Sequence, residues 1–188
     1  MRSLVSDLVV ASLAYVGTMF DNYFAFAAQL VVTARDRYRR VAWAQATGVA
    51  TLVVIAWGVG AAFNAVPLRL IGLLAIAPWG LAWYAWRHRH APAPDAPRRG
   101  ATTTFLATLA LGGDNLAVWI PLLRARGVAG ALVMVATFAA LEVIFVVSSQ
   151  YLASRPRVVA WGTRHAPTLV PVVYAALGVL VLFECHTL

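Results

Sequence analysis

The stretch LGGDNLAVWIPL, residues 111–122, places an aspartate and an asparagine directly after two glycines in one of the most apolar parts of the chain. A second stretch, TMFDNYFAF at residues 18–26, carries the same Asp-Asn pair in a similar apolar run. A charged carboxylate is costly inside apolar surroundings, and an ionisable residue within a membrane is a functional candidate by default. The pairs Asp21-Asn22 and Asp114-Asn115 are therefore the first candidates for a functional site.

The composition indicates an integral membrane protein. Of the 188 residues, 62% are hydrophobic and 12% are charged, whereas a soluble domain carries about 25% charged residues. The net charge of +8 comes from arginines in short gaps between apolar runs, which argues against a nucleic-acid partner. The single cysteine, Cys185, excludes an internal disulfide or a cysteine-pair redox site. The N-terminal apolar run continues past Asp21 and is too long for a signal peptide.

Six apolar runs are long enough to cross a bilayer, which needs about 20 residues of helix. They occupy residues 8–32, 41–63, 68–86, 102–123, 128–153 and 167–183, and short segments rich in arginine, proline or glycine separate them. The sequence therefore predicts an all-α integral membrane protein with six transmembrane helices.

The placement of arginine predicts the orientation of these helices. Eleven arginines fall in the gaps after the first, third and fifth runs, and four fall on the other side: Arg2, Arg69, Arg124 and Arg126. Short cytoplasmic loops are enriched in arginine. Both termini are therefore expected outside the cytoplasm, in a bacterial plasma membrane.

The two Asp-Asn pairs indicate an internal repeat. A shift of 93 positions brings Asp21-Asn22 onto Asp114-Asn115, and three predicted spans separate the pairs, so the two halves must insert with opposite orientation. The predicted organisation is a three-helix repeat at residues 1–90, a Pro-rich cytoplasmic linker at 91–100 and a second three-helix repeat at 101–188. Inverted repeats are typical of secondary transporters, whose sites lie near the bilayer midplane.

Depth places both aspartates near that midplane. Asp21 lies about 20 Å along a helix from residue 8, and Asp114 about 18 Å from residue 102, in a core about 30 Å thick. No arginine or histidine lies at comparable depth in the six runs. The two carboxylates are therefore expected to bind protons or a cation.

The side chains around the two pairs predict an oxygen cage for one divalent metal ion. The expected metal ligands are Asp21, Asn22, Asp114 and Asn115. Gly112 and Gly113 weaken the helix before Asp114, and Gly17-Thr18 can do the same before Asp21, so that Thr18, Gly112 and Gly113 could offer carbonyl or hydroxyl oxygens. Met19 could add a soft thioether. The alternative is that protonated aspartates only join packed helices by hydrogen bonds.

Glu142 is a further carboxylate within the apolar runs, about 21 Å along the fifth run from residue 128. It is expected to hold a proton at neutral pH unless a cation approaches, because loss of hydration disfavours the charged form. This behaviour suits a carrier that exchanges a proton for an outgoing metal, so Glu142 is the candidate for proton coupling. The alternative is a permanently protonated residue that makes one interhelical hydrogen bond.

The two motifs resemble those of the cadmium-resistance transporter family, within the lysine-exporter superfamily. The first reads GTMFDN at residues 17–22 and the second GGDNLAVWIPLL at residues 112–123. The ending RHAPTLVPVVYAALGVLVLFECHTL is also similar to that of the family, with Pro171, Gly178 and Glu184 in place. Asn22 stands where many members carry a second aspartate, which lowers the charge of the site.

This resemblance implies efflux of cadmium or a related divalent metal, such as zinc or manganese, through the two Asp-Asn pairs. Together with Glu142, it leads us to expect proton-coupled transport with no resident cofactor and no enzymatic activity. The expected partners are the lipid bilayer and the metal ion. A second copy of the chain, in a homodimer, is a further possible partner. Oxygen ligands also suit an exporter of manganese or calcium type. Export of an organic solute such as an amino acid is a second alternative. An intramembrane aspartyl protease is a remote third, because Leu111 stands where its signature needs glycine.

Overall fold

The computed structural model describes residues 4–88 and 100–185, and nearly all of them are helical, with no strand in these ranges. The helices are α1 (Leu4–Thr18), α2 (Phe20–Val31), α3 (Tyr38–Ala62), α4 (Leu68–Ile71), α5 (Ile76–His88), α6 (Ala101–Leu111), α7 (Gly113–Ala125), α8 (Gly127–Ala153) and α9 (Pro156–Glu184). Short 3-10 turns are η1 (Arg35–Arg37), η2 (Phe63–Ala65) and η3 (Gly72–Ala75). The all-α prediction is confirmed. The predicted linker at 91–100 lies outside the described residues except for Gly100.

Several of these helices can cross a bilayer. The segment Arg35–Ala62, α8 and α9 are each long and apolar enough on their own. The pairs α1 with α2 and α6 with α7 also qualify together, although they are bent by 54° and 58°. Counting each bent pair as one span gives up to five candidate spans in the described part of the chain. This pattern supports a multi-pass membrane protein.

The third predicted span, residues 68–86, is helical but divided. The 3-10 turn η3 separates the short α4 from α5. The 13 residues of α5 are fewer than the ~20 that a bilayer requires. A span at residues 68–86, which would bring the total to six, therefore stays a prediction.

The segment between the fifth and sixth predicted spans, residues 154–166, is helical over most of its length. Helix α9 begins at Pro156 and continues through Pro167 and Pro171. Proline fits the first turn of a helix because its missing N–H would have no partner there. Proline inside a membrane helix is tolerated where neighbouring groups take up the freed backbone carbonyls.

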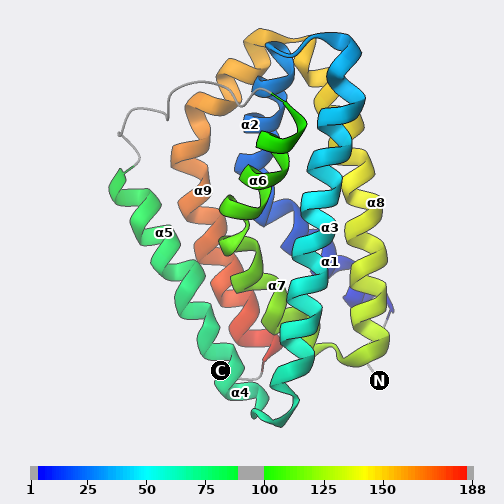
Figure 1. The fold of residues 1–188 in the computed structure, drawn as a ribbon. Helices are drawn as coiled ribbons and strands as arrows, with labels where there is room; N and C mark the ends of the chain where they lie inside the picture. The colour runs from blue at the N-terminus through cyan, green and yellow to red at the C-terminus, as the bar shows by residue number, and fades with distance from the viewer. Residues whose placement is uncertain (1–3, 89–99, 186–188) are drawn as a thin grey trace.

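The two bent helix pairs run in opposite directions. Figure 1 shows α1 and α2 running from one end of the bundle to the other, and α6 and α7 running back. Each bent pair packs on the long helix of the other half, α1 and α2 on α8 and α6 and α7 on α3, while α5 packs on α9. Helix α1 begins and α9 ends at the same end of the bundle. We call this the terminal end, and the opposite end, where α2 passes into α3 and α8 into α9, the loop end.

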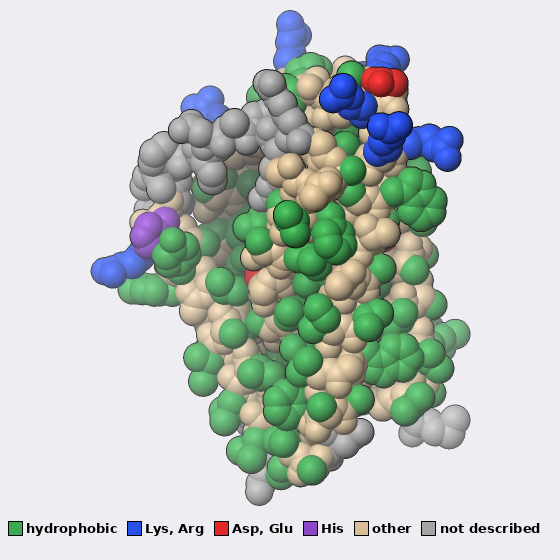
Figure 2. Space-filling model, viewed as in Figure 1, with side chains coloured by type: hydrophobic (Ala, Val, Ile, Leu, Met, Phe, Trp, Pro, Cys, Tyr) green, Lys and Arg blue, Asp and Glu red, His purple; other side chains and the backbone are tan. Residues whose placement is uncertain are grey.

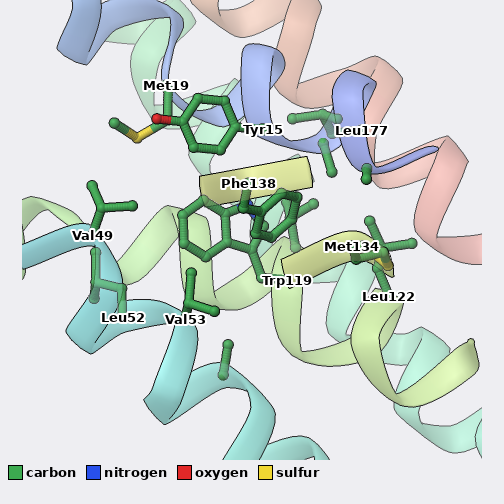
Figure 3. Close-up of a cluster of buried hydrophobic side chains, with 14 of the residues drawn as sticks. Tyr15, Met19, Val49, Leu52, Val53, Trp119, Leu122, Met134, Phe138 and Leu177 are labelled. Atoms are coloured by element: carbon green, nitrogen blue, oxygen red, sulfur yellow. The ribbon is translucent and has the colours of Figure 1, made fainter. Parts of the chain in front are cut away.

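An aromatic cluster around Trp119 holds the bent pairs together. The Trp119 ring is fully buried, with its centroid 4.8 Å from that of Phe138 and 6.2 Å from that of Tyr15. Figure 3 shows Met19 beside Tyr15, and Val53 and Leu122 on the other side of the indole. In a bilayer, close van der Waals packing drives helix association because lipid tails are as apolar as the side chains. The cluster thus fixes α1 and α7 against α8.

The surface fits a lipid environment. Large apolar side chains such as Val54, Ile144 and Val172 are exposed by 60% or more, and the face in Figure 2 is apolar over most of its height. The basic side chains in that view gather near the loop end, where Arg35 and Arg39 are exposed. An apolar belt with arginines at one end is typical of a membrane protein with a cytoplasmic basic face.

Candidate metal-transport site

Each Asp-Asn pair begins a half-helix directly after a helix break. Asp21 lies in the first turn of α2, which follows α1 after Met19 alone. Asp114 lies in the first turn of α7, which follows α6 after Gly112 alone. The residue at each break has nearly the same backbone conformation, with φ −95° and ψ 4° at Met19 and φ −79° and ψ 4° at Gly112. The structure therefore has a bent break where the sequence predicts one in both halves, although the carbonyls of Met19 and Gly112 still accept hydrogen bonds from Tyr23 and Leu116.

Glycine is needed near the breaks for space. A Cβ on Gly112 would overlap the side chain of Leu52 in α3, and a Cβ on Gly17 would lie 2.9 Å from Leu177 in α9. The negative φ of Gly112 is accessible to any residue. Close approach of a neighbouring helix, and not backbone freedom, therefore explains Gly112.

The two aspartates are held in the same local geometry. The backbone N–H of Asn22 donates to Oδ1 of Asp21, and that of Asn115 donates to Oδ1 of Asp114, each at 2.8 Å. The first turn of a helix also favours a negative charge, because its N–H groups carry partial positive charge. In each motif, one carboxylate oxygen is thus tied to its own half-helix, and the other is available to a partner.

Tyr174 of α9 brings the two motifs into one site. Its hydroxyl donates to Oδ2 of Asp114, and it interacts electrostatically with Asp21 as well. Asp21 and Asp114 also interact electrostatically with each other. The structure therefore brings together two carboxylates that are far apart in the sequence, and it adds a phenol that sequence reasoning missed. The sequence offered one indication of this residue: the hydroxyl of Tyr174 is a polar group within the apolar run that follows Pro171.

Asn115 and Met19 join the second motif to the break of the first. Asn115 is 1% exposed, and its Nδ2 donates to the Met19 sulfur at 3.7 Å. The Oδ1 of Asn115 is buried and has no hydrogen-bond partner among the described residues. A buried oxygen without a partner is unfavourable, and a bound cation would satisfy it. Asn22 is partly buried.

The predicted additional oxygen ligands are already engaged or lie apart. The Thr18 hydroxyl donates to the carbonyl of Ala14 at 2.9 Å and accepts from Trp119 Nε1 at 3.1 Å. The carbonyl of Gly112 accepts the N–H of Leu116 at 3.0 Å. A Cβ on Gly113 would face open space. These groups remain predicted ligands, and Thr18 would have to give up a hydrogen bond or share its hydroxyl to act as one.

The site is poor in strong metal ligands. Among the described residues, no group of three or more His, Cys, Asp or Glu side chains could hold a metal ion. Beyond the two aspartates, a cation there would depend on amide, hydroxyl, carbonyl or thioether groups. Such a donor set suits transient binding to a cargo ion better than a permanent structural metal, which is usually held by four strong ligands.

Glu142 forms a separate buried pair. It is 6% exposed, and its Oε2 accepts a hydrogen bond from the hydroxyl of Tyr15. Its Oε1 is buried without a hydrogen-bond partner in the described part of the chain. Tyr15 lies one turn before Met19 on α1. Glu142 is therefore connected to the first break through α1 and the aromatic cluster.

Comparison with known proteins gives one family match in the second part of the chain. A family model described as cadmium resistance transporter matches residues 98–188, a segment that contains the second motif, Glu142 and Tyr174. No curated protein and no solved structure gives a match to the chain. The resemblance of the second motif and of the C-terminal segment to the cadmium resistance transporter family is thus confirmed over α6 to α9, which lie in the matched residues 98–188.

Proposed function

We propose that the chain exports a divalent heavy metal cation, cadmium or a similar ion, across the bacterial plasma membrane. The ion would bind between the two Asp-Asn pairs. The observation that carries this proposal is the position of Asp21 and Asp114 at two matching helix breaks, near enough for their charges to interact with each other and with Tyr174. Discontinuous helices at the midplane are the usual way in which transporters expose polar groups to an ion.

The proposed architecture is six spans in two inverted three-helix repeats. The opposite courses of the bent pairs (Figure 1) and their reciprocal packing on α8 and α3 support it. In this proposal the helical segments α4, η3 and α5 would together form the third span. The excess of arginines at the loop end supports a cytoplasmic loop end and a terminal end outside the cytoplasm.

Labelling from each side of the membrane tests this orientation. A cysteine at Ala96, which lies outside the described residues, should react only from the cytoplasmic side in a chain whose Cys185 is replaced by alanine. Reaction at residue 96 from outside in intact cells would refute the proposed arrangement.

Charge and ligand chemistry support a divalent cargo. Two carboxylates match the charge of one divalent ion, and burial strengthens their attraction for it. Asn115 Oδ1 and the Met19 sulfur lie together and add a hard and a soft ligand. A thioether favours soft ions such as cadmium, whereas an all-oxygen set would suit manganese or calcium equally. We therefore place cadmium first, with zinc and manganese as the alternatives.

Glu142 is the proposed proton carrier. It lines a groove between α3 and α8 whose two parts have volumes of about 390 Å³ and 270 Å³, and Arg39 and Gln150 line the smaller part. Arg39 lies at the loop end, so the groove extends from that end towards Glu142. Among the described residues, the hydroxyl of Tyr15 donates a hydrogen bond to Glu142 and thereby bears directly on its charge.

A transport assay with purified protein in proteoliposomes tests the function. The panel would contain cadmium, zinc, manganese, calcium and an amino-acid mixture, each measured with and without an imposed pH gradient. We expect cadmium flux that depends on the gradient. Amino-acid flux without metal flux would favour the organic-solute alternative, and neither flux would refute a transporter of either kind.

A further inference from the structure

Three charged side chains form a buried cluster at the terminal end. Arg126, which is 9% exposed, contacts Asp7 through Nη1 and Glu184 through Nη2, at 2.5 Å in each case. Its Nη1 also donates to Ser6 Oγ at 3.1 Å. Asp7 belongs to α1 in the first half of the chain, whereas Arg126 and Glu184 belong to the second half. The Asp7–Arg126 ion pair therefore joins the two halves at this end.

The turn between α7 and α8 is shaped to place this arginine inside. Gly127, the next residue, has φ +64°, a conformation that side chains disfavour. Gly130, one turn into α8, leaves the room that Arg126 occupies, because a Cβ there would lie 2.8 Å from Arg126 Cβ and 3.3 Å from Asp7 Oδ2. Gly127 and Gly130 thus allow the guanidinium of Arg126 to turn into the bundle and not towards solvent.

The other end of the bundle is joined differently. There, Gln29 of α2 donates to Thr104 of α6 at 2.6 Å, and Thr108 of α6 donates to Gln45 of α3 at 2.7 Å. These contacts between the halves are neutral hydrogen bonds, which contribute less than buried contacts between opposite charges. The terminal end is therefore the more strongly closed of the two.

We propose that Asp7, Arg126 and Glu184 form a gate that closes the terminal end of the metal path. This inference rests on the proposed transport function. A cation that reaches this end is attracted by the two carboxylates and repels Arg126, so the cargo itself competes for the groups that keep the gate closed. Displacement of the guanidinium separates α1 from the α7–α8 turn and lets the ion leave.

Thiol labelling of the full-length protein in proteoliposomes tests the gate without measuring transport. The native Cys185, which follows Glu184 and is fully buried, is the first reporter. A second reporter is Val10→Cys in a Cys185→Ala background, because Val10 is buried three residues after Asp7 on α1. Both should react slowly with a membrane-impermeant maleimide in the otherwise unchanged chain, compared with the same protein unfolded in detergent.

Asp7→Asn and Arg126→Gln should each raise both labelling rates about tenfold, because loss of one partner leaves the other charge buried and uncompensated. Asp36→Asn, which removes an exposed carboxylate at the loop end, is the matched control and should leave the rates unchanged. Wild-type labelling rates in both charge variants would overturn the gate. Fast labelling of both reporters in the chain with an intact cluster would overturn it as well.

A steric variant keeps the test decisive if the charge variants fail to insert. Gly130→Ala improves helix propensity but pushes a methyl group against Arg126 and Asp7, so labelling should rise severalfold. Gly58→Ala, whose new Cβ would meet nothing within 4 Å, is its control. Equal rates in these two variants would refute the gate. Absence of metal flux in the wild type would instead refute the transport function while leaving the labelling result intact.

Discussion

The two Asp-Asn motifs share a local structure but differ in how firmly their side chains are held. Asp114 accepts a hydrogen bond from Tyr174, and Asn115 is buried against the Met19 sulfur. The Asp21 carboxylate, by contrast, accepts a hydrogen bond from the backbone N–H of Asn22, within its own helix turn. A symmetric sequence repeat has thus produced an asymmetric site, with a fixed second motif and a more adaptable first one. We infer that the second motif positions the ion and that Asp21 closes on it.

The largest expected effect comes from removing either carboxylate. Asp21→Asn and Asp114→Asn should each reduce cadmium flux into proteoliposomes to background, and the double variant should be no worse, because residues that act as a unit are not additive. The exposed Asp36→Asn is the control. Wild-type flux in either single variant would show that the two motifs do not share one ion.

The second expected effect sharpens the difference between the motifs. Tyr174→Phe removes the hydroxyl that holds Asp114 and should weaken cadmium binding about tenfold, since a hydrogen bond to a charged group contributes roughly 1.5–3 kcal/mol. Tyr15→Phe removes the matching hydroxyl from Glu142 and should leave cadmium affinity nearly unchanged. Titration calorimetry of both purified variants provides the comparison. Equal losses in the two would mean that the tyrosines act only through packing.

Glu142→Gln should alter coupling and not binding. The variant keeps the size of the side chain but can no longer release a proton, so cadmium should still bind while flux ceases to rise with the imposed pH gradient. The measurement is cadmium flux at several gradients, with calorimetry on the same preparation. A variant that follows the wild type at every gradient would make Glu142 structural and leave proton transfer to the aspartates.

The smallest expected effect concerns selectivity. Met19→Leu preserves volume but removes the thioether, so cadmium affinity should fall severalfold while manganese affinity stays close to that of the wild type. Competition between the two ions for the purified protein gives the ratio directly. An unchanged ratio would mean that the sulfur only packs against Asn115.

The sequence predicted those features that depend on local chemistry. Glycines before Asp114 and a Gly-Thr pair before Asp21 predicted the helix breaks, and apolar length predicted most of the spans. Helix α9 begins at Pro156, before the predicted span at residues 167–183, because apolar length locates the membrane span and not the start of the helix, and proline suits a first helical turn. Tyr174 and Arg126 could not be predicted, since their contacts with Asp114 and Asp7 depend on how distant helices pack. Tertiary packing also created the unpartnered oxygen of Asn115.

Cadmium binding to the purified chain tests the shared site most directly. Titration calorimetry should give one cadmium ion per chain in the wild type, and X-ray absorption at the cadmium edge should show mostly oxygen neighbours with one sulfur. Asp21→Asn and Asp114→Asn should each lose this binding, because neither motif alone supplies both negative charges. Retention of wild-type affinity and stoichiometry in either variant would contradict a site formed by both motifs.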